Sequence, residues 1–206
     1  MLPVSQVPSL TGGAEDYPCL AVQLTRLDQI DIAELAAEWM AQVELFVEAT
    51  GRNPSHLDSH HHFSYFTPEI FRIMLELARN YNCAIRFPYT KPDDEDIEGL
   101  PPALVPLMRK AGPALLAEFN PPHPDYFNSS FYATTVNETD LRRILADLQP
   151  GTTELMSHPA YVDDLLMSTS TYNSTRGVEL ALLTDPALKE FLKEQGIELT
   201  NFKGIK

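Results

Sequence analysis

The sequence predicts an α/β fold with a largely parallel sheet. Short strand-like runs alternate with amphipathic helical segments along the chain, and this alternation is typical of strands joined by helical crossovers. The two histidine motifs each lie where such a run ends, and ligands of parallel sheets gather at the carboxyl ends of strands. With 206 residues, 44% hydrophobic and 21% charged, we expect one domain spanning residues 1–206.

The individual elements follow from apolar spacing and capping residues. Ile32, Leu35, Trp39, Val43 and Phe46 recur at steps of three and four, which predicts a helix over 31–49 with these side chains on one face. Further helices are expected over 67–81, 137–148, 176–183 and 185–196, and over 103–118 with interruptions at Pro106 and Pro113. Strands are expected over 55–62, 83–87, 152–157 and 197–202. Residues 1–20 are expected to be irregular, and residues 88–102 to form a solvated loop that holds the acidic run 93–96.

Composition restricts the classes of partner. A formal net charge of −14 argues against nucleic acid and against an anionic membrane surface, and it is compatible with a neutral or cationic ligand. Two cysteines, Cys19 and Cys83, are too few for a disulfide framework. The sequence has no apolar run long enough for a membrane span and no secretory signal pattern, so we expect a cytoplasmic protein.

Four of the six histidines lie within seven residues, from His56 to His62. If this segment is extended, His56, Asp58, His60 and His62 share one face. Imidazoles bind zinc and similar ions, and a carboxylate serves as a ligand or orients a histidine. The segment therefore favours a metal site, and the alternative is an accidental polar loop or a tag-like tract.

A second candidate is His158, which follows the strand-like Glu154-Leu155-Met156 and precedes Pro159. A single histidine is more often structural than catalytic. Its position at the end of an expected strand favours a role in a site, and both interpretations stay open from the residues alone.

Several strings resemble one family. Residues 53–62, Asn-Pro-Ser-His-Leu-Asp-Ser-His-His-His, are similar to the signature of the YdjC-like carbohydrate deacetylases, which include chitooligosaccharide deacetylases. Residues 85–88, Ile-Arg-Phe-Pro, and 124–127, Pro-Asp-Tyr-Phe, resemble further family stretches. Residues 151–163, which contain His158, resemble its second signature. The likeness covers nearly the whole chain.

The resemblance implies a (β/α)-barrel-like fold of the polysaccharide-deacetylase type and a divalent metal ion, Mg²⁺ or Zn²⁺. The implied reaction is hydrolysis of N-acetyl groups from N-acetylglucosamine-containing oligosaccharides, and a homodimer is a further family expectation. By position, the resemblance implies catalytic roles for His158 and Asp58, substrate contacts for Arg86, His62 and Tyr126, and metal binding by His60 with His56.

The sequence departs from the family pattern at its front. The family's Ala-Asp-Asp-Phe-Gly and His-Leu-x-Leu-Thr motifs, which supply a base, a carboxylate ligand and a second metal histidine, do not occur here. We therefore expect a fold that is incomplete at its N-terminus. The alternatives to an active deacetylase are a catalytically inactive carbohydrate-binding remnant and a different metal-dependent hydrolase.

Overall fold

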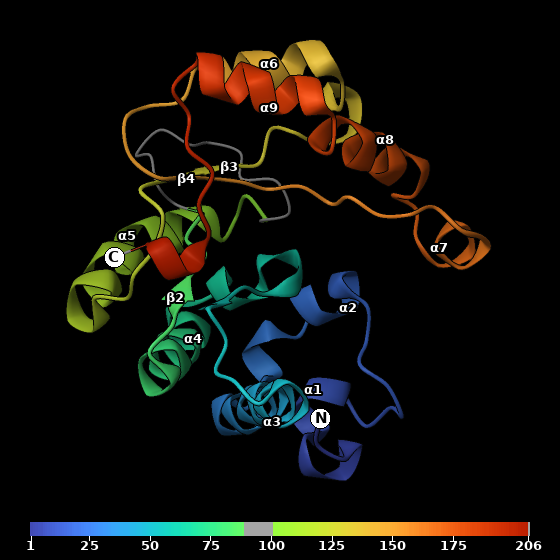
Figure 1. The fold of residues 1–206 in the computed structure, drawn as a ribbon. Coiled ribbons are helices and arrows are strands. Elements are labelled where there is room, and N and C mark those ends of the chain that lie inside the picture. The colour runs from blue at the N-terminus through green and yellow to red at the C-terminus, as the bar shows by residue number, and fades with distance from the viewer. Residues whose placement is uncertain (89–100, 206) are drawn as a thin grey trace. The chain divides into compact units, whose positions relative to one another are not determined.

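The computed structural model describes residues 1–88 and 101–205 and divides into two compact units (Figure 1). The first unit contains Met1–Arg86 and residues 101–123, and the second contains residues 87–88 and 124–205. The acidic run predicted to be a solvated loop, residues 93–96, lies outside the described residues.

The first unit is mainly helical. Its elements in chain order are the 3-10 helix Val4–Gln6, α1 (Pro8–Thr11), α2 (Leu20–Leu24), the 3-10 helix Leu27–Gln29, α3 (Ile32–Thr50), β1 (His56–Leu57), the 3-10 helix His60–Tyr65, α4 (Pro68–Tyr81), β2 (Ala84–Ile85) and α5 (Val105–Phe119).

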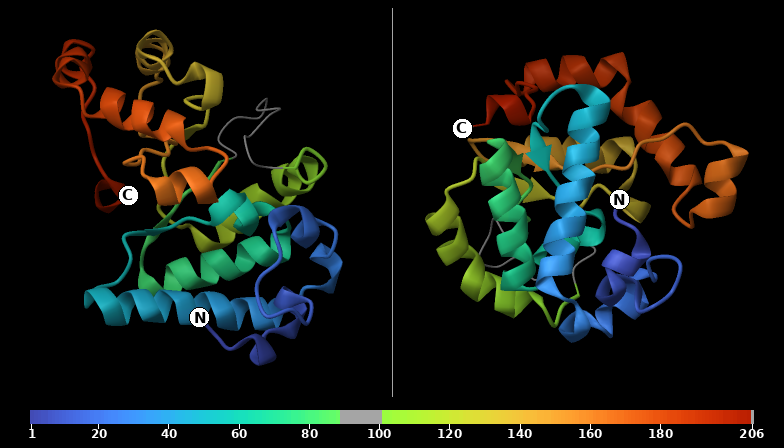
Figure 2. Two further views of the ribbon diagram at one scale, coloured as in Figure 1. Left: turned by 90° about the vertical axis from the view of Figure 1, so that its right-hand side faces the viewer. Right: turned by 90° about the horizontal axis from the view of Figure 1, so that it is seen from below.

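The capping residues expected from the sequence begin the two central helices. The Asp31 carboxylate accepts hydrogen bonds from the first backbone N–H groups of α3, and the Thr67 hydroxyl accepts from the N–H of Ile70 in α4. Both helices end at a residue in the left-handed region, Gly51 for α3 and Asn82 for α4. The two helices lie side by side in Figures 1 and 2, and α4 supplies most of the core of this unit.

The core of the first unit forms where α4, α5, β2 and the segment before α4 meet. Its fully buried large side chains are Tyr65, Phe66, Ile70, Phe71, Leu75, Ile85 and Met108. By contrast, the apolar face of α3 is only partly covered, since Ile32 and Phe46 stay 39% and 41% exposed. The helix was predicted correctly, but its expected core face is not packed against protein along its whole length.

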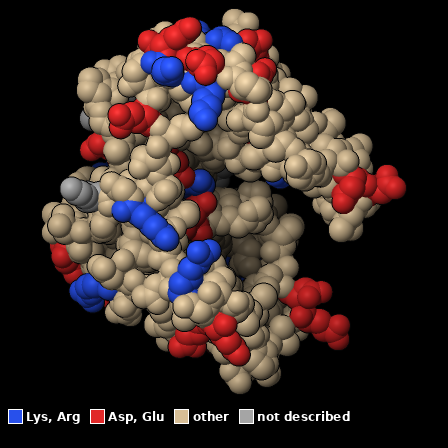
Figure 3. All heavy atoms as spheres, viewed as in Figure 1, with Lys and Arg blue, Asp and Glu red and all other residues tan. Residues whose placement is uncertain are grey.

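The second unit also mixes helices and strands. Its elements are β3 (Tyr126–Asn128), the 3-10 helix Ala133–Thr135, α6 (Glu138–Ala146), β4 (Thr153–Leu155), α7 (Asp164–Thr169), α8 (Ser174–Leu183), α9 (Pro186–Glu194) and the 3-10 helix Phe202–Gly204. Phe131, Val136, Leu141 and Ile144 form a buried cluster, against which Leu155, Leu182 and Leu188 pack. Figure 3 shows acidic and basic side chains intermixed over the region of α6 and α9.

Both sheets are parallel pairs, as the sequence predicted. In the first unit β1 pairs with β2 with His56 opposite Ala84, and in the second β3 pairs with β4 with Tyr126 opposite Thr153. The mixed helix and sheet content is therefore confirmed. Among the described residues each sheet has two strands, so a closed barrel is not shown by them.

Three predictions of local structure need correction. Residues 1–20 are irregular only in part, because Val4–Gln6 form a 3-10 helix, Pro8 opens the short helix α1 and Leu20 begins α2. The chain over 197–202 forms no described strand; the N–H of Ile197 closes the end of α9 by bonding to the carbonyl of Leu192. The strand predicted over 55–62 stops at Leu57. None of the helices in the described part of the chain combines the length and the apolar character that crossing a bilayer requires.

Candidate functional site

The strand register of the first unit places Asp58 opposite Arg86. His56 pairs with Ala84 and Leu57 with Ile85, so the next pair across the sheet is Asp58 with Arg86, at the carboxyl ends of both strands. Arg86 Nη1 lies 2.7 Å from Asp58 Oδ2, and the two side chains are 17% and 30% exposed. The Arg86 peptide is held as well, because its N–H donates to the Leu57 carbonyl at 3.1 Å and its carbonyl accepts from the Tyr65 hydroxyl. A fixed carboxylate therefore stands where parallel sheets present their ligands.

The surroundings of Asp58 and His56 shift the pKa values of these two groups in opposite directions. Burial raises the pKa of the Asp58 carboxyl, although the Arg86 guanidinium and the N–H of Ser59 oppose that shift. Burial lowers the pKa of His56, against the attraction of Asp58. Its Nδ1 lies 3.0 Å from the Ser55 hydroxyl. A general base is most effective when its pKa lies near the working pH, so the raised pKa favours this role for Asp58.

The rest of the histidine cluster is not an extended strand. His61 and His62 have φ angles of 54° and 55°, in the left-handed region that few non-glycine residues adopt. The turn is closed by Ser59, whose hydroxyl oxygen accepts the Ser64 N–H at 2.9 Å and lies 2.7 Å from the Ser64 hydroxyl. The predicted common face of His56, Asp58, His60 and His62 is therefore wrong, because the chain turns after Ser59.

The three later histidines have different surroundings. His60 and His61 are exposed, with ring centroids 4.0 Å apart. His62 is 4% exposed and lies beside Tyr65, with ring centroids 6.1 Å apart. The predicted substrate contact of His62 thus belongs to a side chain that this structure buries.

A cavity of about 720 Å³ adjoins this segment, entirely within the first unit. Its volume lies in the range of about 300–1,000 Å³ typical of small-molecule sites. The partly covered face of α3 forms one wall, and β1 with the turn after it forms another. The lining includes Leu35, Trp39, Val43 and Phe46 from α3, His56, Asp58, His60, His61 and Phe63 from the β1 side, and Leu10, Met74 and Leu77.

One part of the cavity wall is polar. Glu38 is 1% exposed, and its carboxylate accepts hydrogen bonds from the N–H of Leu2 and from Gln42 Nε2, both at 2.7 Å. Burial, followed by the charge of Glu38, raises the pKa of Tyr17 to about 12. These donors satisfy a carboxylate that would otherwise be costly to bury. The lining of the cavity thus combines aromatic and aliphatic side chains with polar ones, among them Glu38, His56 and Asp58.

The predicted metal ion does not fit the described side chains by themselves. Residues 1–88 and 101–205 contain no group of three His, Cys, Asp or Glu side chains that could together hold a metal ion. A catalytic zinc takes three protein ligands and a water molecule. Asp58 is engaged by Arg86, and His56 and His60 provide two donors at most. Metal binding by His60 and His56 therefore stays a prediction.

In the second unit, His158 follows β4, as the sequence predicted. Its backbone N–H donates to Glu179 and its carbonyl accepts from Arg176 Nη1 at 3.2 Å. Its ring lies edge-on to Tyr132 and Tyr172, with centroids 5.5 Å and 5.8 Å away. Sequence reasoning did not single out these four neighbours as site residues. Arg176 and Glu179 lie three apart in a helical segment, which indicates a shared face, but nothing local ties that face to His158.

Tyr126, the other predicted substrate contact, begins β3 in the second unit and is half-buried. Its ring lies close to Gly151, where a Cβ atom would come within 3.3 Å of Tyr126 Cε2 and 2.8 Å of Asp125 Oδ2. Gly151 has φ 131°, so only glycine suits both the backbone and the space. The adjacent Phe127 is buried, as expected for a core side chain.

Comparison with known proteins decides the family. A model of the YdjC-like protein family matches residues 1–194. The chain belongs to the YdjC-like family. It is 34% identical over 180 residues to a carbohydrate deacetylase of Thermoanaerobacter pseudethanolicus, and the aligned residues make up 87% of this chain and 63% of that protein. It is 32% identical over 203 residues to a chitooligosaccharide deacetylase of Yersinia pestis, covering 97% of this chain and 72% of the relative.

A solved structure also resembles this YdjC-like chain. It is a protein of Enterococcus faecalis V583, provisionally named as a cellobiose-phosphate cleavage protein. The two superpose with a TM-score of 0.76 at 26% identity, over 98% of this chain and 71% of the other. The family expectation from the histidine motifs is thereby confirmed. The chain spans less than two thirds of the length of the Thermoanaerobacter relative.

Proposed function

We propose that this chain removes N-acetyl groups from an N-acetylglucosamine-containing oligosaccharide. The observation that carries the proposal is Asp58, which is paired with Arg86 and lines a cavity whose lining is largely aromatic and aliphatic. The names of the relatives support it, since two of them are called carbohydrate and chitooligosaccharide deacetylase. An uncharged acetylated sugar also suits a chain with a formal net charge of −14.

In this proposal the sugar lies in the cavity of the first unit. Trp39 and Phe63 line it, with ring centroids 6.5 Å apart in an edge-to-face arrangement, and such rings offer apolar surface to the C–H faces of a sugar. Asp58 and His56 stand at the β1 side of the same cavity. The acetamido group is therefore proposed to face Asp58, with the sugar ring against α3.

The proposed chemistry assigns one proton transfer to each of two residues. Asp58 takes a proton from the water that attacks the acetamido carbonyl, and Arg86 holds the carboxylate in place. When the carbon–nitrogen bond breaks, the departing amine takes up a proton. We propose His158 as the donor because residues 151–163 resemble the second signature of the family. One water is consumed, and acetate and a primary amine are the products.

The divalent ion also belongs to the proposal, as Mg²⁺ or Zn²⁺. When bound, such an ion polarises a carbonyl and lowers the pKa of a water. Since the described residues supply no three-ligand group, no step of the reaction is assigned to it here.

A second candidate is a protein that binds acetylated sugars without hydrolysing them. The observation in its favour is the same shortage of gathered ligand side chains, combined with an intact cavity. The two candidates differ in turnover and not in binding.

The test is acetate release from N,N′-diacetylchitobiose, with Mg²⁺ or Zn²⁺ added in separate reactions. We expect acetate and amine in equal amounts from the wild-type protein, and a large loss with Asp58→Asn. Saturable sugar binding without any acetate would favour the second candidate. If the protein neither binds the sugar nor releases acetate, both candidates are wrong.

A further inference from the structure

The backbone N–H and the carbonyl of His158 both form hydrogen bonds with side chains of one helix in the second unit, α8. The carboxylate of Glu179 accepts the N–H of His158, and Arg176 Nη1 donates to the His158 carbonyl at 3.2 Å. The backbone N–H of Ala160 donates to the carbonyl of Arg176 at 3.2 Å. Arg176 and Glu179 lie three residues apart in α8 and so share a face. The chain on both sides of the His158 ring is therefore anchored to α8.

Glu179 is a buried carboxylate with hydrogen bonds to both of its oxygens. Its side chain is fully buried, at 0% exposure, and a buried carboxylate is costly unless hydrogen bonds compensate it. Its second oxygen accepts the hydroxyl of Tyr172. Burial and this bond to Glu179 raise the pKa of Tyr172, so the hydroxyl keeps the proton that it donates. Charge-assisted bonds of this kind are stronger and more directional than neutral ones.

Two tyrosine rings restrict the imidazole itself. Tyr132 and Tyr172 stack on each other with centroids 4.4 Å apart and planes inclined by 20°. The His158 ring meets each of them at a steep angle, 66° and 75°. Edge-to-face contacts of this type have a preferred geometry. The stacked pair therefore disfavours rotation of the histidine ring away from one orientation.

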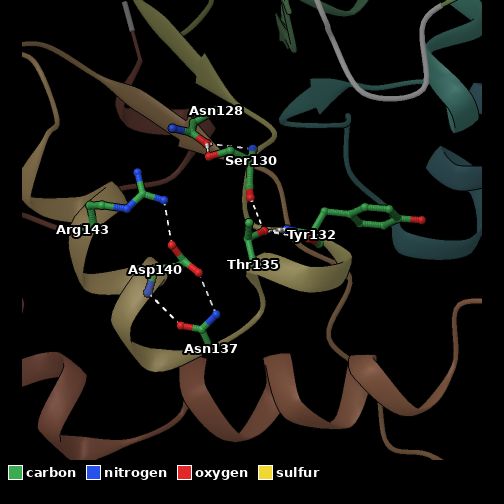
Figure 4. A network of polar contacts seen from close by, with 7 residues as sticks. All are labelled: Asn128, Ser130, Tyr132, Thr135, Asn137, Asp140 and Arg143. Atoms are coloured by element: carbon green, nitrogen blue, oxygen red, sulfur yellow. Dashed lines mark hydrogen bonds and ion pairs between the residues drawn. The ribbon is translucent and has the colours of Figure 1, made fainter.

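The turn that carries Tyr132 is itself fixed by hydrogen bonds, as Figure 4 shows. The Thr135 hydroxyl oxygen accepts the N–H of Tyr132 at 3.0 Å and lies 2.6 Å from the Tyr132 carbonyl. Asn128 Oδ1 accepts from both the N–H and the hydroxyl of Ser130. Ala133 takes a φ of 52°, and its N–H donates to the Tyr172 hydroxyl at 3.4 Å. The turn and α8 thus meet at one tyrosine oxygen.

We propose that Glu179 and Tyr172 are positioning residues for His158, holding its peptide and its ring in the orientation from which it delivers a proton. This inference rests on the proposed function, in which His158 protonates the departing amine. Neither residue is assigned any contact with substrate. A catalytic group held loosely loses rate steeply, since displacement by about 1 Å can cost about a hundredfold.

The test combines kinetics with a signal that reports the His158 peptide directly. Glu179→Gln keeps the shape but removes the charge, and Tyr172→Phe keeps the ring but removes the hydroxyl. Glu190→Gln, at an exposed position of α9, is the matched control. In ¹H–¹⁵N spectra, the His158 amide proton should lie far downfield in the wild-type protein and move upfield in Glu179→Gln.

In the same variants we expect kcat for acetate release to fall by about tenfold or more in Glu179→Gln, by less in Tyr172→Phe, and not in Glu190→Gln. KM should stay within about twofold, because binding is not what these residues control. An unmoved His158 amide in Glu179→Gln overturns the proposal, and so does an unchanged kcat with a moved amide. If Glu179→Gln does not fold, Tyr172→Phe decides, through the same two readouts.

Failure of the proposed function would look different. A wild-type protein that releases no acetate overturns the catalytic assignment of His158. The positioning role is then judged by the His158 amide shift and by ring-proton contacts between His158 and Tyr132. Loss of those contacts in Tyr172→Phe supports it, and their persistence in both variants overturns it.

Discussion

The two histidine-bearing segments differ in how their side chains are held. The segment from His56 to His62 carries four histidines, yet its backbone turns after Ser59 and sends their rings into different surroundings. The segment at His158 carries one histidine, and α8 and a tyrosine pair hold both its peptide and its ring. Density of histidines along the chain is therefore a poor guide to how well a histidine is positioned.

The first segment nevertheless contains a carboxylate, that of Asp58, which is held by an ion pair at the end of a strand. Asp58 gains its position from the strand register, and its raised pKa from burial. The second segment gains its order from hydrogen bonds over 18 and 21 residues of sequence. The first segment thus contains a carboxylate with a raised pKa, Asp58, and the second contains a histidine ring in a restricted orientation, His158. The two proposed roles can be tested separately.

The largest expected effect is at Asp58. Asp58→Asn keeps the shape but removes the base, so kcat for acetate release should fall by about a hundredfold or more. The thermal midpoint is the control, since a misfolded variant would lose activity for another reason. A folded Asp58→Asn protein with kcat within about twofold of wild type would show that this carboxylate is not the base.

A smaller effect is expected from the turn beside His158. Thr135→Val removes the oxygen that accepts the Tyr132 N–H. Because a donor left without an acceptor costs about 1–3 kcal/mol, this variant should lower the free energy of unfolding by about that amount. Thr134→Val, at an exposed neighbouring position, should change the free energy of unfolding by less than about 0.5 kcal/mol. Urea denaturation measures both, and equal stability of the two variants would contradict the account of this turn.

Strain in the first segment predicts a stabilising substitution. His61 has φ 54°, which costs an ordinary residue about 1–2 kcal/mol, whereas glycine adopts this conformation freely. His61→Gly should therefore raise the free energy of unfolding by up to about 1 kcal/mol. His60→Gly, whose backbone is not left-handed, should lower it by about 0.5–1 kcal/mol. The same sign for both would argue against a strained turn.

The smallest effect is in the pH dependence of stability. The pKa of His56 is lowered in the folded protein, so below pH 6.5 the unfolded chain binds a proton that the folded chain resists. Stability is therefore lost as pH falls from the ordinary pKa of His56 towards its lowered value. His56→Gln should reduce the loss of stability between about pH 7 and pH 5. Urea unfolding at several pH values measures it, and identical slopes for both proteins would contradict burial of the imidazole.

Local signals in the sequence were sufficient for the helices. Thr67-Pro68 and the apolar spacing after it predicted α4, because capping and periodicity act within one or two turns. The face of α3 that carries Trp39 and Phe46 was also visible, but its exposure to a cavity was not. Whether an apolar face is covered depends on segments distant in the sequence.

The site was predictable only in part, for the same reason. The residue types at His56, Asp58 and His158 were sufficient to predict that both segments contain candidate site residues. The Asp58–Arg86 contact depends on a strand register between residues 28 positions apart in the sequence. The hydrogen bond between Glu179 and the His158 N–H depends on the packing of α8 beside the segment that carries His158. The alternating pattern over 56–62 predicted a strand, but the Ser59–Ser64 bonds favour a turn that no periodicity reveals.

The most direct test of the central claim uses the one tryptophan of the chain. Trp39 lines the cavity of the first unit, so its emission reports what enters there. Titration with N,N′-diacetylchitobiose should change the fluorescence in a saturable way, and cellobiose, which lacks the acetamido group, should bind more weakly. Emission that stays unchanged up to the solubility limit of the acetylated sugar would contradict the account.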